Sequence, residues 1–135
     1  MIQDYNNYSV LIAEDNYINQ KLMRKLLQKL GYKCDIVDDG AKVVDLLQEK
    51  QFDIILMDIQ MPVMDGYEAT RKIRESEKYN GRHIPIVAVT AFAMERDRQL
   101  AYEAGMDDFL PKPFSKNDFY YVIEKHIRSK NRIFQ

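Results

Sequence analysis

Several features that mark other classes of protein are scarce in this chain of 135 residues. Cys34 is the single cysteine, so no intrachain disulfide can form and no cysteine-based zinc site is indicated. Five glycines and four prolines are too few for a low-complexity or collagen-like chain. No apolar run approaches the roughly 20 residues of a membrane-spanning helix, and the first residues, MIQDYNNYSV, lack the basic and apolar regions of a signal peptide. We therefore expect no membrane insertion and a cytoplasmic, reducing location.

Neither sign of charge dominates the chain, because 20 Lys and Arg residues stand against 21 Asp and Glu residues. A net charge of −1 gives no general attraction to nucleic acid, so no direct binding to DNA or RNA is expected. The apolar share of 46% and the charged share of 30% are near those of ordinary globular proteins. At roughly 100–200 residues per domain, the length predicts one domain.

Short β-branched or apolar runs alternate with helical patterns along the whole chain. The predicted strands are 8–13, 33–37, 53–57, 84–89 and 108–110. The predicted helices are 17–30, 41–50, 67–77, 94–104 and 116–128. Strands that alternate with helices in this way indicate βαβ units and a parallel sheet with helices on both faces. The sequence therefore predicts one α/β domain over 8–128, with short tails at 1–7 and 129–135.

The first predicted helix carries a candidate surface as well as a core face. At 100° per residue one apolar stripe contains Leu22, Met23, Leu26, Leu27 and Leu30. Ile18 points about 110° away from that stripe, and Tyr17 lies beside it. Isolated exposed apolar residues are ordinary. An apolar residue at this place also suits a docking surface, and both interpretations stay open.

Polar side chains follow four of the predicted strands. Glu14 and Asp15 follow the first strand, Asp58 the third, Thr90 the fourth and Lys112 the fifth. In an open parallel α/β sheet, ligands bind beyond the carboxyl ends of the strands. Each of these residues alone is an ordinary turn, cap or strand residue. Their joint placement predicts one functional rim.

The chemistry of that rim points to phosphoryl transfer. Clustered carboxylates repel one another unless a cation lies among them, and oxygen ligands favour Mg²⁺ or Mn²⁺ over zinc. A dication, a lysine and a hydroxyl are what a phosphoryl group needs for charge neutralisation and hydrogen bonding. A carboxylate can form an aspartyl phosphate. We expect Asp58 to be the acceptor, Asp15 to bind the metal, Glu14 to do so directly or through water, and Lys112 to pair with Asp58 or its phosphoryl oxygen.

The chain at this point resembles the receiver domains of two-component response regulators. The resemblance covers about residues 8–128 and rests on four motifs in order, namely VLIAEDN, DIILMDIQMPVMDG, IVAVTAFA and DFLPKPF. The residues after the acidic pair and the MDIQMPVMDG segment look most like receivers attached to hybrid sensor histidine kinases. The resemblance implies a flavodoxin-like (βα)5 sheet of strand order 2-1-3-4-5.

The resemblance also implies a function and further site residues. A phosphohistidine on a histidine kinase or histidine phosphotransfer protein would phosphorylate Asp58 with Mg²⁺ bound, and homodimers are possible in such a family. The Gln60 backbone carbonyl would be a metal ligand, Phe109 would move together with Thr90, and the bond before Pro113 would be cis. Such a domain assists its own phosphorylation and dephosphorylation but is a signalling module rather than a turnover enzyme.

The phosphohistidine must reach Asp58 at the rim, and the first helix begins there. We therefore expect Tyr17 and Ile18 to contact the partner.

Three other functions fit the residues less well. An aspartate-nucleophile phosphohydrolase of the haloacid dehalogenase type needs a second Asp where this chain has Gln60, which cannot transfer a proton. A nucleotide-binding domain needs a glycine-rich phosphate loop that the sequence lacks. A degenerate receiver that only binds partners usually lacks an acidic residue or the lysine, and this chain has both. The sequence leaves open the stimulus, the kinase, the output, the oligomeric state, the phosphoryl lifetime and whether the chain belongs to a larger protein.

Overall fold

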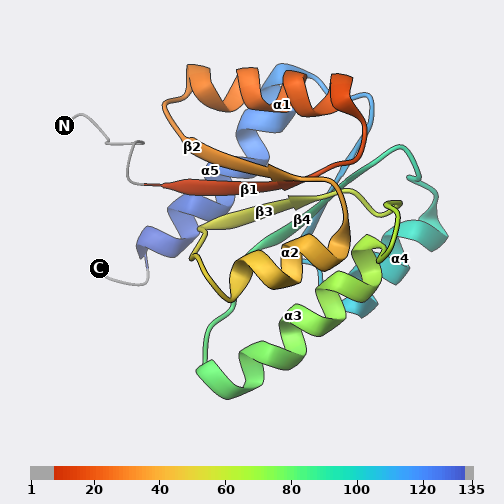
Figure 1. Ribbon diagram of the computed structural model, residues 1–135. Helices are drawn as coiled ribbons and strands as arrows, with labels where there is room; N and C mark the ends of the chain where they lie inside the picture. The colour runs from red at the N-terminus through yellow and green to blue at the C-terminus, as the bar shows by residue number, and fades with distance from the viewer. Residues whose placement is uncertain (1–7, 133–135) are drawn as a thin grey trace.

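The computed structural model describes residues 8–132, with side chains described through residue 128. Five strands alternate with five helices in this part of the chain (Figure 1). The strands are β1 (Ser9–Ala13), β2 (Lys33–Val37), β3 (Ile54–Met57), β4 (Ile86–Thr90) and β5 (Asp108–Pro111). The helices are α1 (Tyr17–Lys29), α2 (Gly40–Leu47), α3 (Gly66–Asn80), α4 (Glu95–Ala104) and α5 (Lys116–Arg132).

The strands form one parallel sheet of order β2-β1-β3-β4-β5, which confirms the predicted order. Helices α1 and α5 cover one face of the sheet, and α2, α3 and α4 cover the other (Figure 1). The chain therefore has three layers, with the sheet in the middle.

Two apolar clusters lie between these layers. The central strand β3 is buried on both faces, and its residues alternate between the clusters: Ile54 and Leu56 contact one, Ile55 and Met57 the other. Helices α1 and α5 complete the first cluster with Met23, Leu26, Leu27, Phe119, Val122, Ile123 and Ile127. The second cluster is completed mainly by α2, α3 and α4. Strands that are buried on both faces read as continuous apolar runs, as β3 and β4 do.

Most element boundaries fall within two or three residues of the prediction. Helix α3 continues to Asn80 rather than ending at residue 77, because the first strong helix breaker is Gly81, which caps it at a φ of 69°. Helix α2 ends at Leu47, three residues early, in a turn in which the Lys50 amide donates to the Leu46 carbonyl. Helix α5 runs to Arg132, so the predicted tail at 129–135 begins inside the helix. The predicted tail at 1–7 and residues 133–135 lie outside the described residues.

Leu22 was wrongly assigned to the buried stripe of α1, since 48% of it is exposed. Met23, Leu26 and Leu27 face the sheet, whereas Leu22 lies at the edge of their stripe, nearer to Ile18. Polar side chains cap two of the helices: the Asn16 side chain accepts a hydrogen bond from the Asn19 amide at 3.0 Å, and Ser115 Oγ accepts one from the Asp118 amide at 3.0 Å.

One arginine connects several elements at the amino ends of the strands. Arg74 on α3 donates to the Ile84 and Gly105 carbonyls at 2.8 and 2.9 Å. It also pairs with Glu77 at 2.6 Å and with Asp107 at 2.7 Å. This network ties α3 to the segments that lead into β4 and β5. No helix within residues 8–132 is both long and apolar enough to cross a membrane.

Candidate functional site

The register of the sheet brings the three carboxylates of the predicted rim together. Ala13, the last residue of β1, is paired with Met57, the last residue of β3. The residues that follow are therefore neighbours, and the Asp58 amide donates to the Ala13 carbonyl at 2.9 Å. The predicted convergence of Glu14, Asp15 and Asp58 follows from this register.

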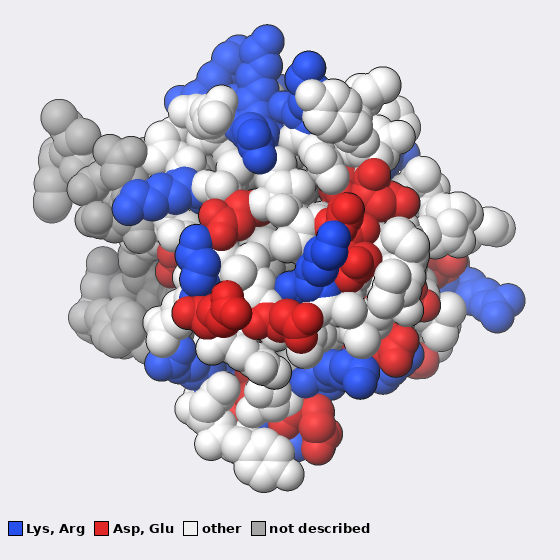
Figure 2. All heavy atoms as spheres, in the orientation of Figure 1, with Lys and Arg blue, Asp and Glu red and all other residues white. Residues whose placement is uncertain are grey.

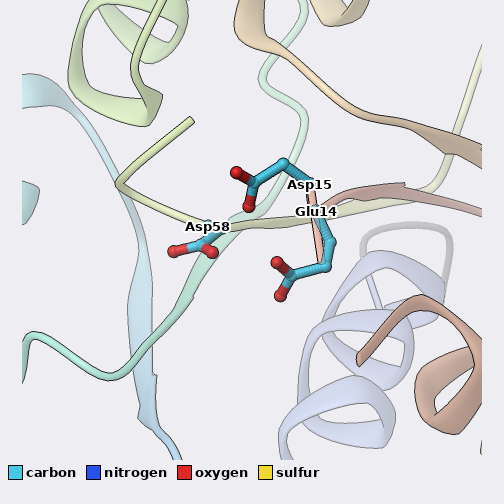
Figure 3. Close-up of side chains that lie close together, drawn as sticks. All are labelled: Glu14, Asp15 and Asp58. Atoms are coloured by element: carbon cyan, nitrogen blue, oxygen red, sulfur yellow. The ribbon is translucent and has the colours of Figure 1, made fainter. Parts of the chain in front are cut away.

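The three carboxylates form one cluster at the carboxyl ends of β1 and β3. Each offers an oxygen, and these oxygens all lie within 4.8 Å of one another. Figure 3 shows Glu14 and Asp15 approaching from the end of β1 and Asp58 from the end of β3. Glu14 and Asp58 are buried, and Asp15 is exposed. The cluster is therefore open to solvent on the side of Asp15.

Lys112 joins the cluster from the loop after β5. Its ammonium forms a close ion pair with the Glu14 carboxylate and lies 3.3 Å from Asp58 Oδ2. The sequence predicted the contact with Asp58, but the nearer partner is Glu14. The Lys112 amide donates to the Thr90 carbonyl at 2.8 Å, and the bond between Lys112 and Pro113 is cis, the isomer that the resemblance implies.

One lysine does not fully compensate the buried charge at this site. Burial raises the pKa of the Glu14 carboxyl above its ordinary value of 4.5, and the negative charge of Asp58 raises it further. Hydrogen bonds from Lys112 and from the Asn16 amide lower that pKa, but less than the other two effects raise it. The site therefore favours an added proton or another cation.

Thr90 and Phe109 lie on adjacent strands beside the cluster. Thr90 is completely buried, and its Oγ1 accepts a hydrogen bond from the Phe92 amide at 3.1 Å. Phe109 is also buried, and the guanidinium of Arg98 lies over its ring at 4.9 Å from the ring centre. Thr90 therefore contacts the segment that leads into α4, and Phe109 contacts the first turn of α4.

The loop after Asp58 is held close to the cluster. The Gln60 amide lies 3.4 Å from Asp58 Oδ1, and its side chain is exposed. Farther along, the Gly66 amide donates to the Ile59 carbonyl at 2.7 Å. A Cβ at position 66 would overlap the Asp58 carbonyl oxygen, so only glycine permits this close approach.

Sequence reasoning missed two residues that fasten α4 near the site. The Tyr67 hydroxyl on α3 donates to the Asp97 carbonyl at 3.2 Å, in the first turn of α4. Arg98 in the same turn covers Phe109, as described above. Both contacts join residues that are distant in sequence, and no spacing in the chain signals them.

The family model of the response regulator receiver domain matches residues 10–124. A hybrid signal transduction histidine kinase (kinase I) of Dictyostelium discoideum is 47% identical over an alignment of 123 residues that covers 87% of this chain and 7% of that kinase. The polar-differentiation response regulator DivK of Brucella ovis is 40% identical over 119 residues, covering 88% of this chain and 95% of that protein. The chain belongs to the response regulator receiver domain family.

Solved structures agree with this assignment. The receiver domain of a sensor histidine kinase from Pseudomonas aeruginosa, determined with a magnesium ion in its active-site cleft, superimposes with a TM-score of 0.82 at 42% identity. The superposition covers 89% of this chain and 97% of that domain. A response regulator receiver from Saccharomyces cerevisiae, solved together with a histidine phosphotransfer protein, has a TM-score of 0.82 at 33% identity and covers 90% of each chain.

Proposed function

We propose that this receiver domain accepts a phosphoryl group on Asp58 from a phosphohistidine of a partner protein. The observation that carries the proposal is the site itself: three converging carboxylates and one half-buried lysine that contacts two of them. In the transfer, an Asp58 carboxylate oxygen bonds to phosphorus while the bond between phosphorus and the histidine nitrogen breaks, and the imidazole leaves with the electron pair. Lys112 neutralises charge on the phosphoryl oxygens, and the Thr90 hydroxyl donates a hydrogen bond to one of them.

The donor set fits a hard divalent cation. Carboxylate and carbonyl oxygens are the ligands that Mg²⁺ prefers, and three carboxylates with one neighbouring lysine leave the site with negative charge in excess. Asp15, Asp58 and the Gln60 carbonyl would hold Mg²⁺ or Mn²⁺, with Glu14 joining directly or through water. The ion supplies charge neutralisation for the transferred phosphoryl group. The magnesium in the Pseudomonas aeruginosa domain supports this assignment.

The site favours a signalling module over a turnover enzyme. A phosphohydrolase of the haloacid dehalogenase type would need a proton-transferring group at position 60, where this chain has an exposed Gln side chain. A receiver that is never phosphorylated is disfavoured because the acidic cluster and the lysine are complete. We further propose that the domain works in the cytoplasm and that phosphorylation moves Thr90 and Phe109 together.

The partner is a histidine kinase or a histidine phosphotransfer protein that docks at the start of α1. Tyr17 and Ile18 are 68% and 75% exposed, and they follow the acidic cluster directly in sequence. Replacement of Ile18 by Asp should slow transfer from a protein donor and leave labelling by acetyl phosphate unchanged. Normal transfer from the protein donor would exclude this docking residue.

The phosphoacceptor is tested by intact-mass analysis after incubation with Mg²⁺ and acetyl phosphate. The wild type should gain one labile phosphoryl group, and Asp58→Asn should gain none, because the amide cannot form the acyl phosphate. Labelling that persists in Asp58→Asn would place the acceptor elsewhere.

A further inference from the structure

A cavity of about 620 Å³ lies between the neighbouring helices α2 and α3 (Figure 1). The two helices begin close together, because the Gly40 amide at the start of α2 donates to the Met64 carbonyl at 2.9 Å, just before α3. Helix α2 has 8 residues and α3 has 15. At about 1.5 Å per residue, α3 therefore continues about 10 Å farther. The cavity occupies the space that the shorter helix leaves beside the last turns of the longer one.

The floor of this cavity is apolar. Phe52 and Ile73 are buried and line it, with the half-buried side chains of Leu47 and Ile84 beside them. Tyr79 also lines the cavity and is 87% exposed, which places its ring at the rim. Sites for small molecules have volumes of roughly 300–1,000 Å³ and are lined mainly by apolar and aromatic side chains. The size and the floor of the cavity therefore suit a small organic molecule.

The acidic side chains at the cavity are already paired within the protein. Glu77 pairs with Arg74 at 2.6 Å and also accepts a hydrogen bond from the Ile84 amide at 2.6 Å. Glu75 pairs with Lys78 at 3.2 Å. The charge of each carboxylate is therefore compensated by a cation that does not line the cavity.

Two cations at the cavity, by contrast, have no acidic partner among the residues whose side chains the structure describes. They are Lys72 on α3 and Arg82 just after it. The third cation, Lys50, pairs with Asp35 at 2.6 Å. The Gln51 amide, oriented with its oxygen towards Arg82, accepts from the guanidinium at 2.8 Å and holds it at the cavity. In the lower part of Figure 2, over α2 and α3, Lys and Arg atoms lie on both sides of largely uncharged surface. The cavity therefore has an excess of positive charge.

We propose that this cavity binds a small amphipathic organic anion, whose apolar body covers Phe52 and Ile73 and whose carboxylate or phosphate contacts Lys72 and Arg82. A neutral apolar molecule would leave the two cations without a partner, and an inorganic anion would leave the apolar floor in contact with water. Six residues separate Phe52 from Asp58 along β3, a distance of roughly 20 Å in an extended strand. The cavity is therefore a second site, at the opposite ends of the strands from the acidic cluster, and it does not depend on the proposed function.

The probe for the test is naphthalene-2-carboxylate, with the uncharged naphthalene-2-carboxamide as its matched control. Each is titrated into the isotope-labelled full chain, and binding is followed by amide shifts in NMR. The carboxylate should bind about tenfold more tightly than the amide, because hydrogen bonds between charged groups are stronger than neutral ones. Shifts should appear at Gln48, Ser76 and Ile84, which line the cavity, and should be absent at Asp15 and Asp58.

Two pairs of substitutions with the same charge change test the cations. Lys72→Gln/Arg82→Gln should weaken binding of the carboxylate about tenfold and leave the amide unchanged. Arg71→Gln/Lys29→Gln alters two exposed residues outside the cavity and should weaken it about twofold at most, because exposed charges are screened by solvent and salt. Ser76→Trp fills the cavity from the exposed side of α3 and should abolish binding of both probes, with an unchanged unfolding midpoint as evidence that the variant folds.

The outcomes separate this site from other occupants and from the phosphoryl site. Equal affinities for the carboxylate and the amide, or equal weakening by the two pairs of substitutions, would overturn the anionic ligand. Shifts that gather elsewhere, or no saturable binding at millimolar concentrations of the probe, would overturn the cavity as a site. Self-association that Ser76→Trp abolishes, measured by sedimentation velocity, would assign the cavity to a second copy of the chain instead. Asp58→Asn should bind the probe as the wild type does, so failure of phosphorylation and failure of this site are distinguishable.

Discussion

Glu14 shows how a single residue of the site opposes the stability of the fold. Its carboxylate is buried beside Asp58, and the pKa of Glu14 is raised by burial and by that neighbouring charge. A carboxyl whose pKa is higher in the folded state than in the unfolded state contributes most stability when protonated. That contribution is present below the ordinary pKa of 4.5 and is lost as the pH rises through the raised value.

Glu14→Gln should therefore stabilise the metal-free domain at neutral pH, by on the order of 1 kcal/mol, because the amide carries no charge and still accepts hydrogen bonds. The advantage over the wild type should shrink as the pH falls through the raised pKa of Glu14 towards 4.5. Urea denaturation in EDTA at several pH values measures this difference. An advantage that stays constant at every pH would show that the charge of Glu14 is not its cause.

The sequence predicted which residues share the rim, because the carboxyl ends of parallel strands lie on the same side of a sheet. It could not predict which contacts are closest. Lys112 was expected against Asp58 and lies nearer to Glu14, since the path of the loop after β5 decides where the ammonium reaches. Leu22 was misplaced for a similar reason: a stripe defined by 100° steps does not show where the sheet surface ends.

At the scale of elements, α4 has the lightest packing near the site. Its buried residues are Ala101 and Ala104, whose side chains are small. Its first turn is held by the Tyr67 hydroxyl at the Asp97 carbonyl and by the contact between Arg98 and Phe109. A helix with few buried apolar contacts is drawn from the low-stability part of a fold and can move at modest cost.

Tyr67→Phe should loosen α4 without changing the rest of the domain. The variant keeps the ring and loses one hydrogen bond, which typically contributes about 1 kcal/mol, or about a fivefold change in a local opening equilibrium. Hydrogen exchange of the α4 amides should accelerate by about that factor. Tyr79→Phe is the matched control, because Tyr79 is a largely exposed tyrosine on the same helix. Equal exchange in both variants would contradict the role of Tyr67.

The order and type of all ten elements were predicted from the alternation of short apolar runs with helical patterns, which is a local signal. The polar side-chain contacts that hold neighbouring elements together were not predicted. Arg74 joins α3 to residues near 84 and 105, and Tyr67 joins α3 to α4, and both contacts depend on helices packed on a completed sheet. Long-range contacts of polar side chains leave no periodic trace in a sequence.

On the scale of the whole molecule, the two ends of the parallel strands have opposite roles. The Arg74 network connects elements at the amino ends of β4 and β5, and the acidic cluster lies at the carboxyl ends of β1 and β3. Charge at the amino ends of the strands is paired, whereas negative charge at the carboxyl ends is in excess. The global stability of the domain should therefore depend on a cation at the carboxyl ends.

Mg²⁺ should raise the free energy of unfolding of the wild type, because a ligand that binds only the folded state stabilises it. The gain is about 2.7 kcal/mol when the concentration is one hundred times the dissociation constant. Asp15→Ala should lose this gain, and in EDTA it should be at least as stable as the wild type, since one of three repelling carboxylates is absent. Thermal unfolding with Mg²⁺ and with EDTA measures both effects. Equal Mg²⁺ stabilisation in the two proteins would remove Asp15 from the metal site.

Phosphorylation should shift the molecule between two states rather than adjust the pocket alone. Thr90 Oγ1 now accepts from the Phe92 amide, and its hydroxyl can also donate to a phosphoryl oxygen on Asp58. Movement of Thr90 towards Asp58 would pull on the segment that leads into α4, and the small Ala91 beside it offers little resistance. Phe109 would follow, because its ring lies under Arg98 of the same helix.

Beryllofluoride with Mg²⁺ mimics the phosphoryl group and allows this shift to be followed by NMR. A ligand moves an equilibrium only by its differential affinity for the two states, and a change from 1:99 to 99:1 requires about 5.5 kcal/mol. Amide shifts should therefore appear together at Thr90, Phe109 and throughout α4, and they should spare α2, which lies towards the β2 edge of the sheet. Asp58→Asn should show none of them. Shifts confined to residues that touch the pocket would mean that the contacts between Thr90, Phe109 and α4 do not form a switch.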